Sequence, residues 1–186
     1  MGINVTEELE ILKLVCQRLE NSGIAYMITG SVAANFYAVP RMTRDIDIVV
    51  QINREDAARL IEIFEGDFYV DAESVKEAMI NRSMFNVIHT ESVFKVDFII
   101  RKDSPYRALE FERRRRIEAE GFSLWIVAPE DLILSKLVWA KESLSELHLG
   151  DVRNLLGTLK EIDRPYLEKW VHSLGLETVY AKVKNE

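Results

Sequence analysis

The chain of 186 residues contains one cysteine, and it has no apolar run long enough to cross a bilayer. Because Cys16 has no second cysteine to pair with, an internal disulfide is excluded. The first residues also lack a basic-then-apolar leader pattern, so we expect a cytoplasmic protein without membrane association. No repeat, low-complexity tract or long linker interrupts the sequence, which favours one core over two large domains.

An excess of positive charge is missing too. The chain carries 31 acidic and 24 basic residues, giving a net charge of -7. Nonspecific nucleic-acid binding depends on neutralising phosphates, so this charge argues against a general nucleic-acid-coating protein. An enzyme that grips one RNA end through a local basic patch remains compatible with this charge. The hydrophobic share of 48% is typical of a globular protein.

Three common catalytic patterns are absent. No Gly-Lys-Ser/Thr occurs, which excludes a Walker-type phosphate loop. His89, His148 and His172 are scattered without ligand spacing, which argues against a zinc site. Ser31 has no Gly-x-Ser-x-Gly setting, so serine hydrolase chemistry is not expected.

Apolar periodicity alternates between strand and helix up to about residue 128 and is helical after it. The pattern predicts an α/β (α+β) fold, in which a mixed sheet flanked by helices forms a core over 1–128 and a small helical bundle over 129–186 packs on it. Expected strands cover 24–29, 45–51, 68–70, 84–89, 93–101 and 116–127. Expected helices cover 6–21, 31–37, 54–65, 72–80, 105–114, 129–143, 147–159, 164–173 and 175–184.

The most informative pattern is a pair of carboxylates inside an apolar strand. Asp45 and Asp47 flank Ile46, so both point to one face of that strand, where repulsion and desolvation oppose them. A third carboxylate, Asp97, lies in a later apolar strand. If the two strands are neighbours, the three carboxylates converge and suit one or two Mg²⁺ ions. The alternative is that Asp45 caps a turn, Asp47 pairs with a lysine and Asp97 is solvated.

A Gly30-Ser31 pair stands at an expected strand-to-helix turn shortly before the acidic strand. Glycine lets the backbone approach a phosphate closely, and the N-terminus of the following helix offers free N–H groups. The Ser31 hydroxyl can add a donor. Arg44, beside Asp45, would either reach a phosphate or neutralise a neighbour.

Two charged residues interrupt apolar stripes in the helical tail. Lys136 and Asp151 each lie four residues from leucines on the same helix face, where an unpaired charge is costly. One interpretation is an ion pair that holds the tail together. The other places Lys136 at the mouth of the carboxylate cluster, where it contacts a triphosphate while Asp151 orients it.

The only basic run, Arg113 to Arg116, is surrounded by glutamates and is interpreted either as a solvated face or as a grip on an RNA backbone. Trp125, Trp139 and Trp170 stand among apolar residues and are expected in the core.

Together, the segments Ile28-Thr29-Gly30-Ser31 and Asp45-Ile46-Asp47 and the later Asp97 resemble the polymerase-beta-like nucleotidyltransferase superfamily. The resemblance implies an α/β fold and Mg²⁺-dependent transfer of a nucleoside monophosphate from a nucleoside triphosphate to an acceptor hydroxyl, with Mn²⁺ able to substitute. The three aspartates would hold the metal, with Asp97 also activating the acceptor. Gly30 and Ser31 would bind the β- and γ-phosphates.

The run Pro129-Glu130-Asp131-Leu132-Ile133-Leu134-x-Lys136-Leu137, followed by Gly150-Asp151-Val152, looks like the AbiEii/AbiGii-type branch of that superfamily. The branch includes toxins of toxin–antitoxin and phage-defence systems, so the resemblance implies an RNA (tRNA) or protein acceptor and an antitoxin partner. In it the lysine and the aspartate are implicated in activity. The chain departs by having Gly-Ser where many members have Gly-Gly. The rival hypothesis is an inactive binding or partner protein that retains the carboxylates.

Overall fold

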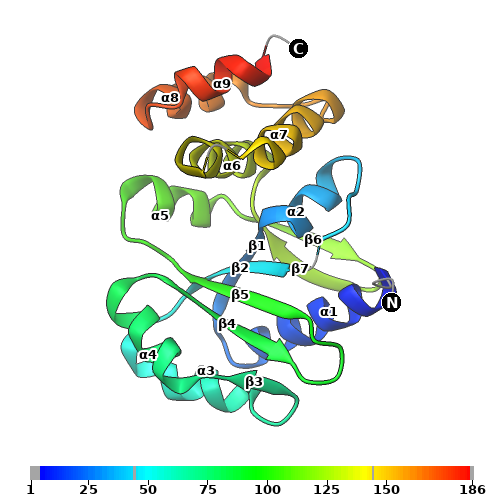
Figure 1. The fold of residues 1–186 in the computed structure, drawn as a ribbon, viewed down its shortest axis with the longest axis vertical. Helices are drawn as coiled ribbons and strands as arrows, with labels where there is room; N and C mark the ends of the chain where they lie inside the picture. The colour runs from blue at the N-terminus through cyan, green and yellow to red at the C-terminus, as the bar shows by residue number, and fades with distance from the viewer. Residues whose placement is uncertain (1–4, 44, 144, 185–186) are drawn as a thin grey trace.

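A mixed sheet of seven strands forms the centre of the computed structural model, which describes residues 5–43, 45–143 and 145–184 (Figure 1). The spatial order is β3-β4-β5-β2-β1-β7-β6. The mixed sheet and its flanking helices confirm the expected α/β class. No helix in the described part of the chain is both long and apolar enough to cross a membrane. The strands are β1 (Ala25–Thr29), β2 (Asp45–Gln51), β3 (Phe68–Val70), β4 (Met84–His89), β5 (Lys95–Ile100), β6 (Arg115–Ala119) and β7 (Phe122–Ile126).

Strand β2 is central, because it pairs antiparallel with β1 and parallel with β5. Its Ile46, Ile48 and Val50 are fully buried, whereas the alternate residues are half-buried or, at the end of the strand, exposed. This alternation orients β2 with its carboxylates on the open face of the sheet. The register sets Asp47 beside Thr29 of β1 and beside Asp97 of β5.

Helices lie at both ends of the molecule in Figure 1, and α1, α2 and α5 lie between the two ends. Helices α3 and α4 lie at the lower end, and α6 to α9 form the upper layer. The segment expected as one helix over 54–65 divides into a 3-10 turn, Arg54–Asp56, and α3. The helices are α1 (Val5–Asn21), α2 (Gly30–Tyr37), α3 (Ala57–Phe64), α4 (Ala72–Asn81), α5 (Pro105–Glu112), α6 (Pro129–Ser143), α7 (Glu146–Thr158), α8 (Arg164–Ser173) and α9 (Glu177–Lys184).

Buried polar contacts join α6 to α5 and α8. Asp131, with no exposed surface, accepts hydrogen bonds from Arg113 at 2.9 Å and from the Tyr166 hydroxyl at 2.6 Å. Glu110 accepts from the Ser135 hydroxyl at 2.6 Å. Buried charges are tolerated when they are paired and hydrogen-bonded. These contacts therefore fix where α6 lies above the sheet.

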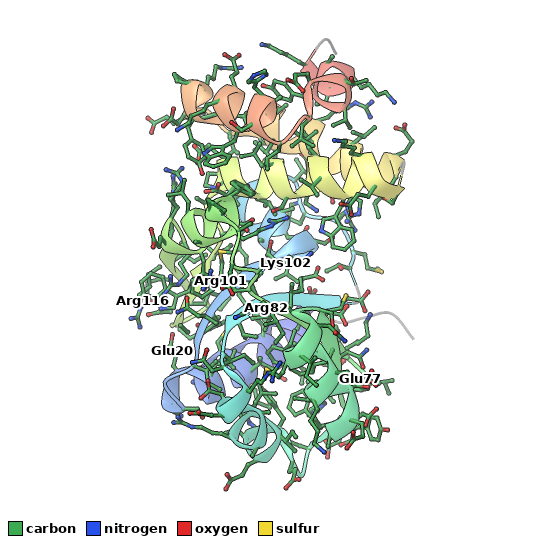
Figure 2. The ribbon with its side chains drawn as sticks, turned by 90° about the vertical axis from the view of Figure 1, so that its left-hand side faces the viewer. Glu20, Glu77, Arg82, Arg101, Lys102 and Arg116 are labelled. Carbon is green, nitrogen blue, oxygen red and sulfur yellow. The ribbon has the colours of Figure 1, made fainter. Side chains whose placement is uncertain are left out.

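The basic run does not form the uniform surface considered from the sequence. Arg113 bonds Asp131, and the Arg114 guanidinium lies 4.8 Å from the Trp125 ring centre. Arg115 and Arg116 are half-exposed and lie within 4 Å of glutamates; for Arg116 the glutamate is Glu20 (Figure 2). The solvated-face interpretation is therefore wrong for the first two arginines, which brace the core.

Candidate active site

Gly30 begins α2 directly beside the acidic strand. Its φ of +65° lies in the left-handed region, and a Cβ built there would overlap the carboxylate of Asp47. Only glycine therefore satisfies both the backbone conformation and the space that Asp47 occupies. The turn brings the free N–H groups of α2 next to a carboxylate of β2, as the sequence pattern predicted.

The carboxylate cluster consists of Asp45, Asp47 and Asp97 on adjacent parallel strands. Asp97 is only 5% exposed, so the alternative in which it is solvated is wrong. The ammonium of Lys95 lies 2.9 Å from Asp97 Oδ2 and 3.5 Å from Asp45 Oδ1. A positive charge does separate two of the carboxylates, but the protein itself supplies it. The sequence analysis did not identify Lys95, although its position two residues before Asp97 on the same face signals it.

The cluster nevertheless retains features of a cation site. Burial, and then the charge of Asp97, raise the pKa of Asp47 to about 6, against the opposing charge of Lys136. Asp97 Oδ1 is buried without a hydrogen-bond partner. Within the residues that the structure describes, no group of three acidic, histidine or cysteine side chains is spaced to hold a metal ion. The carboxylates are therefore not spaced as a metal site in this structure, where Lys95 occupies the place between Asp45 and Asp97. What favours a cation there is the raised pKa of Asp47 and the unpartnered oxygen of Asp97.

A second charged cluster links α2, α6 and α7. Lys136 Nζ donates to Asp151 Oδ2 at 2.7 Å, and the Arg41 guanidinium bonds both oxygens of the same carboxylate at 2.7 and 2.9 Å. Arg41 also donates to Ser31 Oγ at 2.6 Å. The ion pair considered from the sequence is confirmed. Arg41 was missed; its signal was its place between the Gly-Ser turn and the acidic strand.

The electrostatics of this second cluster follow from its burial and pairing. Lys136 and Asp151 are 3% and 5% exposed. Burial alone would raise the pKa of Asp151, but hydrogen bonds from Arg41 and Lys136 hold that pKa below its usual range. Burial lowers the pKa of Lys136 despite its bond to Asp151. The cluster places two cationic groups around one carboxylate.

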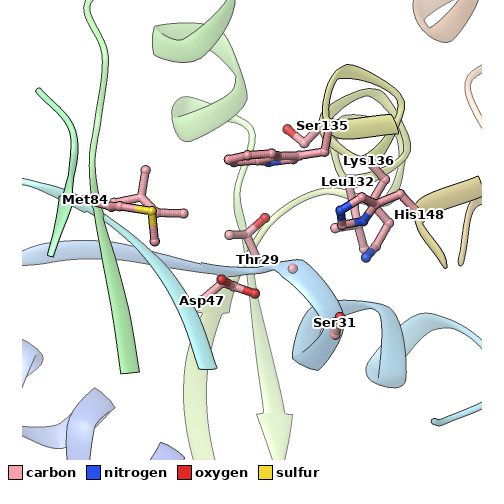
Figure 3. Close-up of a pocket in the computed structure, with 11 residues that line it drawn as sticks. Thr29, Ser31, Asp47, Met84, Leu132, Ser135, Lys136 and His148 are labelled. Atoms are coloured by element: carbon pink, nitrogen blue, oxygen red, sulfur yellow. The ribbon is translucent and has the colours of Figure 1, made fainter. Parts of the chain in front are cut away.

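The two clusters face each other across one cavity of about 210 Å³, here called the catalytic cavity (Figure 3). In Figure 3, Asp47 lies on one side and Lys136 on the other. Four residues expected at the site therefore line this cavity: Gly30, Ser31, Asp47 and Lys136. The other carboxylates, of Asp45, Asp97 and Asp151, are not among its lining. Arg44 lies outside the described residues.

The cavity also contains residues that the sequence analysis missed or misplaced. Trp139 was expected in the core, yet it is 48% exposed and lines the cavity. It follows Lys136 by three residues on α6, which places both on one helix face. His148 of α7 lines the cavity as well, and burial followed by the charge of Lys136 lowers its pKa. The remaining lining residues are Thr29, Met84, Ile99, Leu132 and Ser135.

Solved structures with a similar fold include an antibiotic adenylyltransferase and a putative nucleotidyltransferase from Thermotoga maritima. The antibiotic-resistance factor ANT(2'')-Ia matches with a TM-score of 0.58 at 16% identity, over 97% of each chain. The lincosamide antibiotic adenylyltransferase LnuA matches with a TM-score of 0.56 at 16% identity, over 86% of this chain and 100% of its own. JHP933 from Helicobacter pylori matches with a TM-score of 0.57 at 14% identity, over 93% of this chain and 75% of its own.

These similarities establish the nucleotidyltransferase fold that the sequence resemblance implied. At such identities they do not establish the reaction. No protein-family model matches the sequence, and no curated protein matches it. The AbiEii/AbiGii-type assignment stays a prediction from the sequence.

Proposed function

We propose that the protein transfers a nucleoside monophosphate from a nucleoside triphosphate to an acceptor hydroxyl in a Mg²⁺-dependent reaction. One observation carries the proposal: the Gly30 turn, Lys136 and the Asp47 carboxylate line one cavity, and two further carboxylates stand beside Asp47 on the sheet. Anions favour free N–H groups and ammonium groups, whereas a hard cation favours carboxylates. A magnesium–triphosphate complex requires both environments next to each other.

The phosphate end of the cavity is assembled by α2 and α6. The backbone N–H groups after Gly30 would bind the β- and γ-phosphates. Ser31 Oγ accepts a hydrogen bond from Arg41, which leaves its own proton free to donate to a phosphate oxygen. Lys136 would balance phosphate charge, while Asp151 holds its ammonium in place.

Directly beside the Gly30 turn, Asp45, Asp47 and Asp97 would hold the cation, for which Mn²⁺ could substitute. When bound, the cation neutralises charge on the reacting phosphate oxygens. Asp97, whose second oxygen is unpartnered, would help to activate the acceptor hydroxyl. The acceptor oxygen forms a bond to the α-phosphorus, the bond to the β-phosphate oxygen breaks, and pyrophosphate leaves with those electrons. The acceptor proton passes to a carboxylate or to water.

The test is release of pyrophosphate from each nucleoside triphosphate with Mg²⁺ and total cellular RNA or protein as acceptor. Asp47→Asn should reduce the rate by about 10²–10³-fold, as loss of one preorganised electrostatic group does in other enzymes. Glu77→Gln changes an exposed carboxylate on α4 and serves as the matched control. Equal rates for Asp47→Asn and the native protein would contradict the proposal.

The finer assignment is an AbiEii/AbiGii-type toxin that modifies an RNA (tRNA) end or a protein and is neutralised by an antitoxin. Its support is the segment around Lys136 and the pairing of that lysine with Asp151. Expression in a host cell should then arrest growth, and Lys136→Met should relieve the arrest.

A second candidate, an inactive partner protein with this fold, is favoured by one observation. Lys95 already neutralises Asp97 and Asp45, so a folded state without metal is well compensated. Mg²⁺ with a triphosphate should raise the melting temperature of an enzyme through binding linkage. A melting temperature that Mg²⁺ and the triphosphate leave unchanged would favour the inactive partner protein.

A further inference from the structure

A smaller chamber of about 100 Å³ adjoins the catalytic cavity along the open face of the sheet. Thr29, Ile99, Ser135 and Trp139 line both spaces, so a ligand can extend from one into the other. We call the smaller space the distal chamber. Its far side is made by the residues that follow β5 and by α5.

The distal chamber is walled by cationic side chains. Arg101, Lys102 and Arg107 line it, and Glu110 is its acidic residue. Glu110 is already engaged, because both its oxygens lie 2.8 Å from Arg107 and one accepts from Ser135 at 2.6 Å. Pairing of Arg107 with Glu110 leaves Arg101 and Lys102 as the charges that decide what the chamber binds.

These two cations are incompletely satisfied. Arg101 Nε is buried without a hydrogen-bond partner, while the two other nitrogens of the guanidinium donate to the Lys102 carbonyl and to the exposed Asp103, each at 3.2 Å. Lys102 is exposed and forms no ion pair with any residue in the described ranges 5–43, 45–143 and 145–184. Figure 2 shows both side chains between the upper helices and the lower part of the molecule. A buried donor without a partner is costly, and an anion that accepts from it removes that cost.

The spacing suits an acceptor that bridges the two spaces. Arg101 follows Asp97 by four residues along β5 and its continuation. Four residues of extended strand span about 13 Å. The half-exposed indole of Trp139 stands at the junction and offers an apolar face to a base or sugar. The triphosphate itself has its own donors at the opposite end, from α2 and Lys136.

We infer that the distal chamber binds a phosphate or similar anionic group of the acceptor, whose hydroxyl then lies at Asp97. The inference rests on the proposed function and names the chemistry of the second substrate. A polycationic acceptor such as an aminoglycoside is unsuited, because Arg101 and Lys102 would repel it. The phosphate can come from an RNA end or from a small phosphorylated hydroxyl compound.

The test uses the full chain with Mg²⁺ and α-labelled triphosphate, offered in parallel total RNA, small sugar phosphates, total protein or tobramycin. Label should enter RNA or a sugar phosphate, and which of the two receives it identifies the source. In the variant with Arg101→Gln and Lys102→Gln, the KM for that acceptor should rise at least about tenfold, because the charge-assisted hydrogen bonds to its phosphate are lost. Binding of a nonhydrolysable triphosphate should not change.

Arg116→Gln is the matched control, since Arg116 is a half-exposed arginine outside both cavities. Label on protein or tobramycin alone, or an unchanged acceptor KM in the double variant, overturns the anionic-acceptor assignment but leaves nucleotide transfer intact. If the native protein neither binds nor consumes any triphosphate, the proposed function fails and the acceptor assignment fails with it.

Discussion

The two charged clusters around the catalytic cavity both combine acidic and basic side chains, but acidic groups are in excess in one cluster and basic groups in the other. On β2 and β5, the ammonium of Lys95 pairs with two of the three carboxylates, those of Asp45 and Asp97. Between α2, α6 and α7, two cations share the single carboxylate of Asp151. Each cluster is thus incompletely neutralised by its own partners. The negative one suits a metal ion and the positive one suits phosphates, so together they complement a metal–triphosphate complex.

The largest expected effect is on the negative cluster. Asp97→Asn should lower the transfer rate by about 10²–10³-fold, because it removes a charge preorganised for the reacting groups. Its stability should change little, since asparagine is isosteric and the change relieves repulsion from Asp47. Pyrophosphate release and urea unfolding measure the two quantities. A variant that loses activity only because it unfolds would contradict the assignment of a chemical role to Asp97.

In the positive cluster we expect stability to depend most on Asp151. Asp151→Ala should cost about 3–5 kcal/mol of unfolding free energy, because it leaves the buried Lys136 without its partner. Lys136→Met should cost much less, since Arg41 still bonds the carboxylate and methionine is apolar. Urea denaturation of both variants tests this asymmetry. Equal losses would show that Arg41 does not compensate.

Removing Lys95, the counter-ion that the protein itself supplies, should raise the affinity of the carboxylate cluster for a metal ion. Lys95→Met should tighten Mg²⁺ binding in the absence of nucleotide by up to about fivefold, because a partly exposed ion pair is worth about 0.2–1 kcal/mol. Calorimetric titration with Mg²⁺ or Mn²⁺ measures the change. Lys160→Met, at an exposed lysine of the tail, is the control. Weaker metal binding by Lys95→Met would mean that Lys95 supports the site.

The smallest expected effect is a loss of the stabilisation that Asp151 provides as the pH becomes acidic. The pKa of Asp151 is lowered in the folded protein, so the stabilisation from its ionised form is complete near neutral pH and is lost as pH falls below about 4. The stability difference between the native protein and Asp151→Asn should therefore shrink between pH 7 and pH 3. Urea midpoints across this range provide the measurement, and a difference independent of pH would contradict the lowered pKa.

Several parts of the site could be predicted from local patterns. The alternation in β2 indicated that Asp45 and Asp47 share a face, and the Gly-Ser turn indicated a helix N-terminus beside them. Lys136 was recognisable because a lysine on an apolar stripe needs a partner. Arg41 and Lys95 were missed although their positions near the Gly-Ser turn and near Asp97 offered a weak signal. Their partners on other elements are decided by tertiary contacts that a local pattern does not specify.

The sequence alone determined which side chains share a strand or helix face and where the chain must turn at a glycine, because these follow from backbone geometry over a few residues. The tertiary structure decided that Asp47 stands beside Asp97, that Lys95 lies between two carboxylates, and that α6 and α7 close the cavity from above. Those placements depend on strand register and helix packing between distant segments, which no local periodicity encodes.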